Sequence, residues 1–191
     1  MKIILGSQSK DRQRILKEMG YTFDIVHADI DEKAIRSDDP EELTVTIANA
    51  KADAVLPKIH EPSILITADT VVVCEGRILE KPENEHEARK FFALYPFHPA
   101  IVFSAVVVVN TATKKRRSGC EQATVWLAPF PESVIQELID TKKTFAWAGG
   151  FAVADPVCKP FIKKIEGPSD AVEGLPRALV TQYIKDVSEP K

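Results

Sequence analysis

Hydrophobic residues along this chain fall into short β-branched runs that alternate with stretches of helical periodicity. The runs predict strands at 2–5, 21–27 and 63–67, a hairpin of 71–74 with 77–79, long neighbouring strands at 100–110 and 122–127, and a late strand at 161–165. Apolar residues spaced three and four apart predict helices over 10–19, 40–56, 84–94, 131–142 and 176–185. This order predicts a mixed α/β protein with two lobes around a central sheet.

Local signals mark where two of these helices begin. Asp39 followed by Pro40 places a side-chain cap and a proline at the first helical position. Asn84 and Glu87 have the spacing of a capping box. The boundary between the two lobes has no compositional signal, so residues 1–191 are treated as a single domain.

Composition narrows the classes of protein that fit. The net charge of −3 lacks the basic excess of a dedicated nucleic-acid binder, so no nucleic-acid partner is expected. Three widely separated cysteines favour a reducing compartment over a disulfide framework or a zinc cluster. The apolar run 101–109 is too short to span a membrane, and the run at 2–5 is too short for a signal peptide. We expect a cytoplasmic protein without a membrane partner.

The loop after the first strand has the composition of an anion-binding site. A strand that stops at Gly6 and restarts as a helix near Ser9 leaves backbone N–H groups directed at the loop, next to the hydroxyls of Ser7 and Ser9. Arg12 can reach back toward the same helix N-terminus and bind a phosphate. The alternative is an ordinary serine cap with basic residues on a solvated face.

Asp69 is the strongest single candidate for chemistry. The apolar run 64–68 delivers its carboxylate to a predicted strand end, where sheet proteins commonly build sites. A carboxylate at such a place needs a metal, a lysine or a catalytic water as compensation. The alternative is an aspartate that caps the turn into the following hairpin.

Three further acids and two lysines could join Asp69. Asp29, Asp31 and Glu32 form an acidic loop, and one of them together with Asp69 could hold Mg²⁺ or Mn²⁺; a solvated acidic loop is the alternative. Lys51 lies among small residues in the middle of a predicted helix, and Lys81 precedes a proline. Taken singly, each lysine is typical of a protein surface.

The basic run 114–117 is the only feature that suggests nucleic acid. It contains no interleaved aromatic residue, so a hairpin turn in water is favoured over an RNA-binding site.

Seven short motifs together resemble one family. They are 7–12 (SQSKDR), 29–32 (DIDE), Lys51, 68–72 (ADTVV), 80–82 (EKP), 148–150 (AGG) and 174–176 (GLP). Their order is that of the Maf family of nucleoside triphosphate pyrophosphatases, over nearly the whole chain. The resemblance implies an elongated α/β fold with a long mixed sheet, helices on both sides and a central cleft, related to the inosine triphosphate pyrophosphatases. It also implies a homodimer.

The same resemblance assigns roles to residues. It implies that Asp69, Lys51 and Lys81 are catalytic, that Glu32 and Asp69 bind a divalent metal, Mg²⁺ or Mn²⁺, and that the substrate is bound by Ser7, Ser9, Arg12 and Thr70. The implied reaction cleaves a nucleoside triphosphate substrate into the monophosphate and diphosphate. Such a cleavage requires charge neutralisation, an activated water and in-line geometry.

Two positions depart from the family pattern. Lys10 and Asp11 stand where the family usually has Pro-Arg, and Ala154 stands where members that prefer dTTP and UTP carry Gln. Arg12 and Thr70 nevertheless match the members that prefer dTTP and UTP. The resemblance therefore still implies a pyrophosphatase for pyrimidine nucleotides, with modified or methylated nucleotides as the alternative substrates. A nucleotide-binding regulator with impaired catalysis is the competing function.

Overall fold

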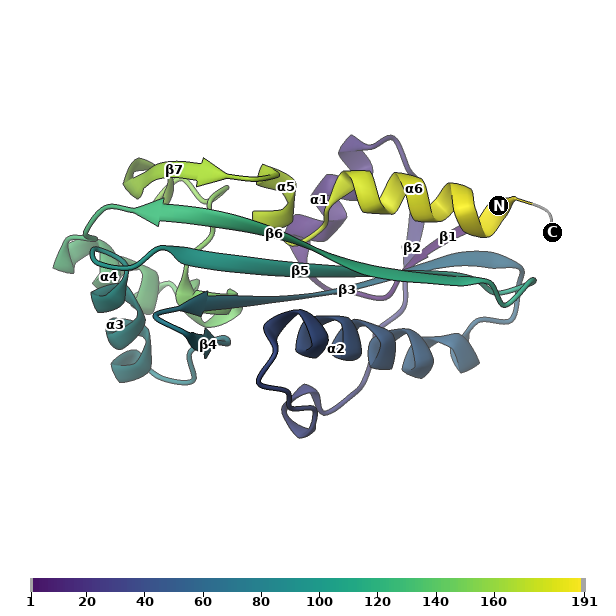
Figure 1. The fold of residues 1–191 in the computed structure, drawn as a ribbon, viewed down its shortest axis with the longest axis horizontal. Helices are drawn as coiled ribbons and strands as arrows, with labels where there is room; N and C mark the ends of the chain where they lie inside the picture. The colour runs from purple at the N-terminus through teal and green to yellow at the C-terminus, as the bar shows by residue number, and fades with distance from the viewer. Residues whose placement is uncertain (1, 190–191) are drawn as a thin grey trace. The chain divides into compact units, whose positions relative to one another are not determined.

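The computed structural model describes residues 2–189, whose strands form one seven-stranded mixed sheet with helices packed on it (Figure 1). The strand order is β2-β1-β3-β5-β6-β7, and β4 pairs with β3 outside this path. The strands are β1 Lys2–Leu5, β2 Phe23–Ile25, β3 Ser63–Cys74, β4 Arg77–Leu79, β5 Ala100–Asn110, β6 Arg116–Leu127 and β7 Ile162–Glu166. β1 is parallel to both of its neighbours, β2 and β3.

Six α-helices connect or follow these strands within the described residues. They are α1 Lys10–Glu18, α2 Pro40–Val55, α3 Glu85–Leu94, α4 Glu132–Asp140, α5 Ser169–Val172 and α6 Arg177–Ser188. A short 3-10 turn, η1, covers Glu32–Ala34. Within residues 2–189, none of the helices is both long and apolar enough to cross a membrane.

The described chain divides into two compact units. The first unit contains residues 2–69, 104–121 and 174–189, and the second contains residues 70–103 and 122–173. β3, β5 and β6 contribute residues to both units. Each unit has its own hydrophobic core.

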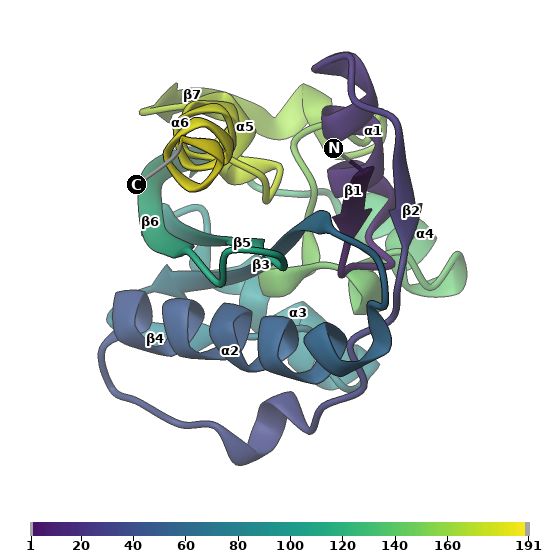
Figure 2. The same ribbon diagram turned by 90° about the vertical axis from the view of Figure 1, so that its right-hand side faces the viewer.

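The first unit has a core on each face of its strands. Alternate residues of β3 point to opposite faces, so Ile64 and Ile66 pack against α1 and α6, whereas Leu65 packs against α2. Figure 2 shows α2 on one side of β3 and β5 and the helices α1 and α6 on the other. Asp69 shares the parity of Leu65, which places its side chain on the α2 face.

The second unit packs α3 and α4 around a cluster of aromatic rings. Phe92 contacts Tyr95 and Phe130, with ring centroids 6.1 and 4.8 Å apart, and Tyr95 stacks edge to face on Phe151 at 5.2 Å. The core residues of β3, β5 and β6 in this unit belong to the same cluster. Buried aromatic rings bring large apolar surfaces into this core.

Most predicted elements are present, and the side-chain caps at Asp39 and Asn84 are confirmed. The reciprocal half of the capping box differs, because the Glu87 carboxylate accepts from the N–H of Glu83 at 2.7 Å. The Asp39 carboxylate accepts hydrogen bonds from the N–H groups of Glu41 and Glu42 at 2.8 and 3.0 Å, and the Asn84 side chain accepts from the N–H of Glu87 at 3.0 Å. β2 is shorter than the predicted strand 21–27, and β6 begins before the predicted 122.

One prediction about the central strand is wrong. Residues 63–67 and 71–74 were expected to form separate strands with a turn at 68–70, but β3 runs unbroken from Ser63 to Cys74. Asp69 is therefore a residue within a strand and not at a strand end. Parallel pairing with β1 extends to Ile66, and antiparallel pairing with β4 begins at Val72, so backbone pairing brackets the polar residues that suggested a turn. The expected hairpin with 77–79 is present.

Candidate active site

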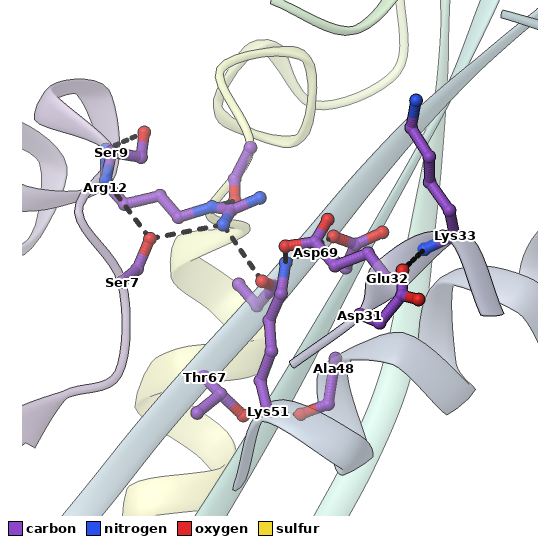
Figure 3. Close-up of polar contacts among 12 residues, drawn as sticks. Ser7, Ser9, Arg12, Asp31, Glu32, Lys33, Ala48, Lys51, Thr67 and Asp69 are labelled. Carbon is purple, nitrogen blue, oxygen red and sulfur yellow. Dashed lines mark hydrogen bonds and ion pairs between the residues drawn. The ribbon is translucent and has the colours of Figure 1, made fainter. Parts of the chain in front are cut away.

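Polar side chains from four segments of the first unit meet at one place (Figure 3). Ser7 and Arg12 come from the loop after β1 and from α1, Glu32 from η1, Lys51 from α2 and Asp69 from β3. These segments are far apart in the sequence. The geometry therefore brings together the acids and cations that the motifs single out, apart from Lys81.

Lys51 bridges the two acids of this cluster. Its Nζ lies 2.7 Å from Oδ1 of Asp69 and 3.0 Å from Oε1 of Glu32. Lys51 is 8% exposed and Asp69 is 5% exposed. A lysine and an aspartate at this depth are tolerated because each neutralises the other. The expectation that Lys51, taken singly, is a surface residue is therefore wrong.

The surroundings of Asp69 act on its pKa in opposite directions. Burial raises the pKa of Asp69 and is the largest effect, while the positive charges of Lys51 and Arg12 lower it and the negative charge of Glu32 raises it again. The net direction is upward. A carboxylate with a raised pKa is a stronger proton acceptor than an exposed one, which suits a general base.

Arg12 ties three parts of the site together. Its Nε donates to the Gly174 carbonyl at 2.9 Å, and its Nη1 donates to the Ala68 carbonyl at 2.9 Å and to Ser7 Oγ at 3.3 Å. Burial lowers the pKa of the Arg12 guanidinium, and the charge of Asp69 opposes that shift. Arginine remains charged at neutral pH, so it brings a fixed positive charge next to Asp69.

The two serines of the loop take part in local structure. Ser9 is the N-cap of α1, and its side chain accepts from the Arg12 backbone N–H at 3.4 Å, so the capping role is confirmed. The Ser9 N–H donates to Ser7 Oγ at 3.2 Å. Ser7 is 9% exposed. These contacts hold the loop in place at a helix N-terminus, a position that favours anions.

Lys81 and Thr70 lie in the second unit. Lys81 is exposed, and it stays a predicted catalytic residue. Its backbone is anchored within that unit, because the Gly149 N–H donates to the carbonyl of Glu80 at 3.0 Å. Thr70 follows Asp69 along β3, so its side chain points to the opposite face of the strand. The role of Thr70 in binding substrate also stays a prediction.

Asp29 and Asp31 are exposed, in contrast to Asp69. The Asp31 carboxylate accepts from the Lys33 N–H at 3.1 Å and caps η1. Of the three acids in that loop, Glu32 is the one that reaches Lys51.

The acids present fit one kind of metal site. Over residues 2–189, no group of three or more His, Cys, Asp or Glu side chains has the arrangement of a metal cage. Mg²⁺, however, commonly binds through one or two carboxylates, with waters and substrate phosphates supplying its other ligands. Asp69 and Glu32, held on a common lysine, are such a pair. The donor set therefore suits a divalent cation that shares its ligands with a polyphosphate.

Two other groups of candidates have structural explanations. In the basic run, Arg116 pairs with Asp53, Arg117 Nε lies 3.6 Å from Oδ2 of Asp186, and the Lys115 ammonium donates to the carbonyl of Glu189. The cysteine thiols are buried wholly or in part, and burial raises the pKa of Cys120 to about 12. A thiol with that pKa is a poor nucleophile at neutral pH.

Sequence reasoning missed two backbone acceptors of this site. The carbonyls of Ala68 and Gly174 fix the Arg12 side chain, yet a carbonyl leaves no trace in residue type. Ala68 and Gly174 each begin one of the seven motifs, and membership in those motifs was the available signal.

The sequence of this chain matches one protein family and several relatives that have names. The profile of the family described as "Maf-like protein" matches residues 2–187. A 7-methyl-GTP pyrophosphatase from Dictyostelium discoideum is 40% identical over 98% of each chain. A dTTP/UTP pyrophosphatase from Carboxydothermus hydrogenoformans is 33% identical, over 97% of this chain and 98% of its own. Among solved structures, a nucleoside-triphosphatase / dITP/XTP pyrophosphatase from Mycobacterium abscessus covers 99% of this chain and 98% of its own, with TM-score 0.44 and 12% identity.

Proposed function

Because this chain belongs to the Maf family, we propose that it is a nucleoside triphosphate pyrophosphatase. It takes up a nucleoside triphosphate and water and releases the nucleoside monophosphate and diphosphate. Relatives that align along nearly the whole chain carry the names of such enzymes, which supports this assignment.

The observation that carries the proposal is the cluster of Asp69, Lys51, Glu32 and Arg12. A buried acid, Asp69, a half-buried acid, Glu32, and two buried or half-buried cations occupy one place in the first unit. Buried charges of this kind reduce stability unless they are paired, and they are typical of sites that handle charged substrates. A triphosphate would meet cations for its oxygens and a carboxylate for water activation in the same cluster.

In the proposed reaction, Asp69 accepts a proton from the attacking water. The water oxygen forms a bond to the α-phosphorus, the bond from that phosphorus to the α,β-bridging oxygen breaks, and the electron pair leaves with the diphosphate. Lys51, Arg12 and the N-terminus of α1 stabilise the negative charge that develops on the phosphate oxygens. Lys81 is the further cation that the motifs assign to this task.

A divalent cation fits the same scheme through Asp69 and Glu32. Bound Mg²⁺ or Mn²⁺ would supply charge neutralisation at the phosphates and would lower the pKa of a water. The protein's own part is to present the two carboxylates in one place, and a cation bound to both would share them with the Lys51 ammonium that contacts each.

The second part of the proposal concerns the base of the nucleoside triphosphate substrate. The 40% identity to a 7-methyl-GTP pyrophosphatase exceeds the 33% identity to a dTTP/UTP pyrophosphatase. Ala154 also stands where pyrimidine-preferring members carry Gln. Both points favour a methylated guanine nucleotide over dTTP and UTP as the first substrate to test.

The experiment is a nucleotide panel with the purified full chain. 7-Methyl-GTP, GTP, dTTP, UTP, CTP and ATP are incubated with Mg²⁺ or Mn²⁺, and the products are separated by anion exchange. We expect monophosphate and diphosphate in equal amounts, and a loss of at least about 10³-fold in kcat for Asp69→Asn. Release of orthophosphate alone would contradict the proposal. Tight nucleotide binding without turnover would support the nucleotide-binding regulator instead.

The family resemblance also leads us to propose a cytoplasmic homodimer. Light scattering coupled to size exclusion gives the mass of the particle in solution, and a mass of one chain would contradict the dimer.

A further inference from the structure

The side chain of Thr67 contacts two of the segments that build the site. Thr67 lies on β3, two residues before Asp69, and it is fully buried. Its hydroxyl donates to the Ala48 carbonyl of α2 at 2.8 Å. A Cβ added to Gly6 would lie 2.6 Å from Cγ2 of Thr67, so the chain after β1 passes directly against this methyl group.

The hydroxyl contact sets how α2 lies along β3. Thr67 and Asp69 point to the same face of the strand, and Ala48 and Lys51 lie one helical turn apart on the same side of α2. Two contacts therefore link strand and helix in order, Thr67 to Ala48 and then Asp69 to Lys51. If α2 slid along β3, the Lys51 ammonium would move away from the Asp69 carboxylate.

The methyl contact acts on the other side of the site. Gly6 is held to β3 by its N–H, which donates to the Ile66 carbonyl at 2.8 Å. Ser7 follows immediately and accepts from Arg12. The Thr67 methyl group fills the space beneath this loop, because glycine leaves no side chain there.

We propose that Thr67 is a positioning residue that holds both Lys51 and the Ser7 loop against Asp69. The kcat and KM tests of this inference depend on the proposed pyrophosphatase function, whereas its structural and binding tests do not. Thr67 acts through other residues, because its hydroxyl is committed to Ala48 and its methyl to Gly6. The hydroxyl contact with Ala48 and the methyl contact with Gly6 are chemically different, so two conservative variants can remove them one at a time.

Thr67→Val keeps the methyl group and removes the hydroxyl, so the hydrogen bond that holds α2, and with it Lys51, against β3 is lost. We expect kcat to fall about tenfold with KM within about threefold of wild type, because small displacements of catalytic groups reduce rate steeply.

Thr67→Ser keeps the hydroxyl and removes the methyl group, which loosens the Ser7 loop, residues 6–9 between β1 and α1. We expect KM for the nucleotide to rise about fivefold with kcat within about threefold of wild type.

Thr44→Val is the matched control. Thr44 is also fully buried, and its hydroxyl donates to a carbonyl of the same helix, that of Pro40. This variant loses an equivalent hydrogen bond on α2 at a distance from Lys51 of nearly two helical turns. We expect its melting temperature to fall as in Thr67→Val while kcat and KM stay at wild-type values.

A double-mutant cycle tests whether the hydroxyl works through Lys51. In a Lys51→Met background, Thr67→Val is expected to cause no further loss of kcat, because the group that it positions is already gone. Independent losses that multiply would overturn the proposal. So would a Thr67→Val variant that differs from wild type only in melting temperature, as Thr44→Val does.

Two measurements judge the proposal without turnover, so that its failure is distinguishable from failure of the proposed function. A crystal structure of Thr67→Val is expected to show Lys51 Nζ beyond hydrogen-bond reach of Asp69, from 2.7 Å in the wild type. Calorimetry with inorganic tripolyphosphate is expected to give about fivefold weaker binding to Thr67→Ser than to Thr44→Val. An unchanged Lys51–Asp69 contact together with unchanged tripolyphosphate binding would overturn it.

Discussion

The ammonium group of Lys51 lies 2.7 Å from the carboxylate of Asp69, although 18 residues separate them in the chain. The same ammonium lies 3.0 Å from Glu32. One buried cation thus neutralises two acids from different segments. A divalent cation that binds these acids must share them with Lys51, and this has a measurable consequence.

Removing the Lys51 charge is expected to strengthen metal binding by the free protein. In Lys51→Met, the two carboxylates lose their positive neighbour, so Mn²⁺ should bind about tenfold more tightly in the absence of nucleotide, although kcat falls to a low, measurable value. Electron paramagnetic resonance of free Mn²⁺ gives the affinity. The control is Lys33→Met, which removes an exposed lysine next to Glu32 in the sequence. Weaker binding by Lys51→Met would mean that Lys51 assembles the two acids.

Acid inactivation is expected to begin at a higher pH than an ordinary aspartate would give. Burial raises the pKa of Asp69, and the reaction needs its ionised form, so kcat/KM falls as the pH drops through this raised pKa. The midpoint should lie above about 3.9, the value for an unperturbed aspartate. A pH profile of kcat/KM for the preformed Mg²⁺–nucleotide complex, with no excess of free Mg²⁺, measures it, because kcat/KM reports the pKa values of the free enzyme.

Arg12 supplies an internal check on that profile. Its charge lowers the pKa of Asp69, so Arg12→Gln should move the acid limb to higher pH as well as reduce the rate. Arg14→Gln is the control, because Arg14 pairs with Glu18 on α1. An acid limb that stays in place in Arg12→Gln would show that Asp69 does not set it.

The elements that sequence analysis predicted well are those with local causes. The N-terminus of α2 follows from Asp39 and Pro40, whose capping contacts depend only on neighbouring residues. β3 was divided in the prediction because Asp69 interrupts its apolar run. β3 pairs with β1, which lies far before it in the sequence, and with β4, which follows it, and these pairings keep the polar segment extended. Neither pairing can be read from the residues of β3 themselves.

The residues of the candidate site could be predicted from the sequence, but their arrangement and burial could not. The motifs pointed to Arg12, Lys51 and Asp69, and these three lie together. The small residues around Lys51 permit close packing, but they do not establish that Lys51 is buried, because a lysine in a helix is solvated unless tertiary contacts cover it. The role of Thr67 depends on the register of α2 along β3, which is a property of the folded chain only.

Gly149 in the second unit is expected to tolerate no side chain. Its φ is 70°, and a Cβ there would lie 2.7 Å from the Tyr95 hydroxyl, which itself donates to the Gly149 carbonyl at 2.5 Å. Gly149→Ala should lower the free energy of unfolding by about 2–4 kcal/mol through left-handed strain and overpacking. Because the Gly149 N–H anchors Glu80, next to Lys81, activity should fall as well.

Gly76→Ala separates the two causes of that loss. Gly76 has nearly the same φ, 71°, but a Cβ there would meet nothing within 4 Å. It should therefore lose only about 1–2 kcal/mol, the strain of the left-handed conformation. Urea denaturation of both variants gives the difference, and equal losses would contradict the packing explanation.

Stability at alkaline pH is expected to depend on the buried thiols. Burial raises the pKa of Cys158 from an ordinary value of 9.0 to about 11, and Cys158 is fully buried. Between these two values the unfolded chain loses its thiol proton while the folded chain keeps it. The free energy of unfolding therefore falls as pH rises, by about 1.4 kcal/mol per pH unit for each such thiol.

The test compares the wild type with Cys158→Ala in urea at pH 8, 9, 10 and 10.5, with a reductant present. The cavity in Cys158→Ala lowers stability at every pH, so only the slope against pH carries the information. We expect a shallower decline above pH 9 for the variant than for the wild type, because one titrating thiol is gone. Parallel declines would mean that the Cys158 thiol ionises equally in the folded and unfolded chains, which burial at this position should prevent.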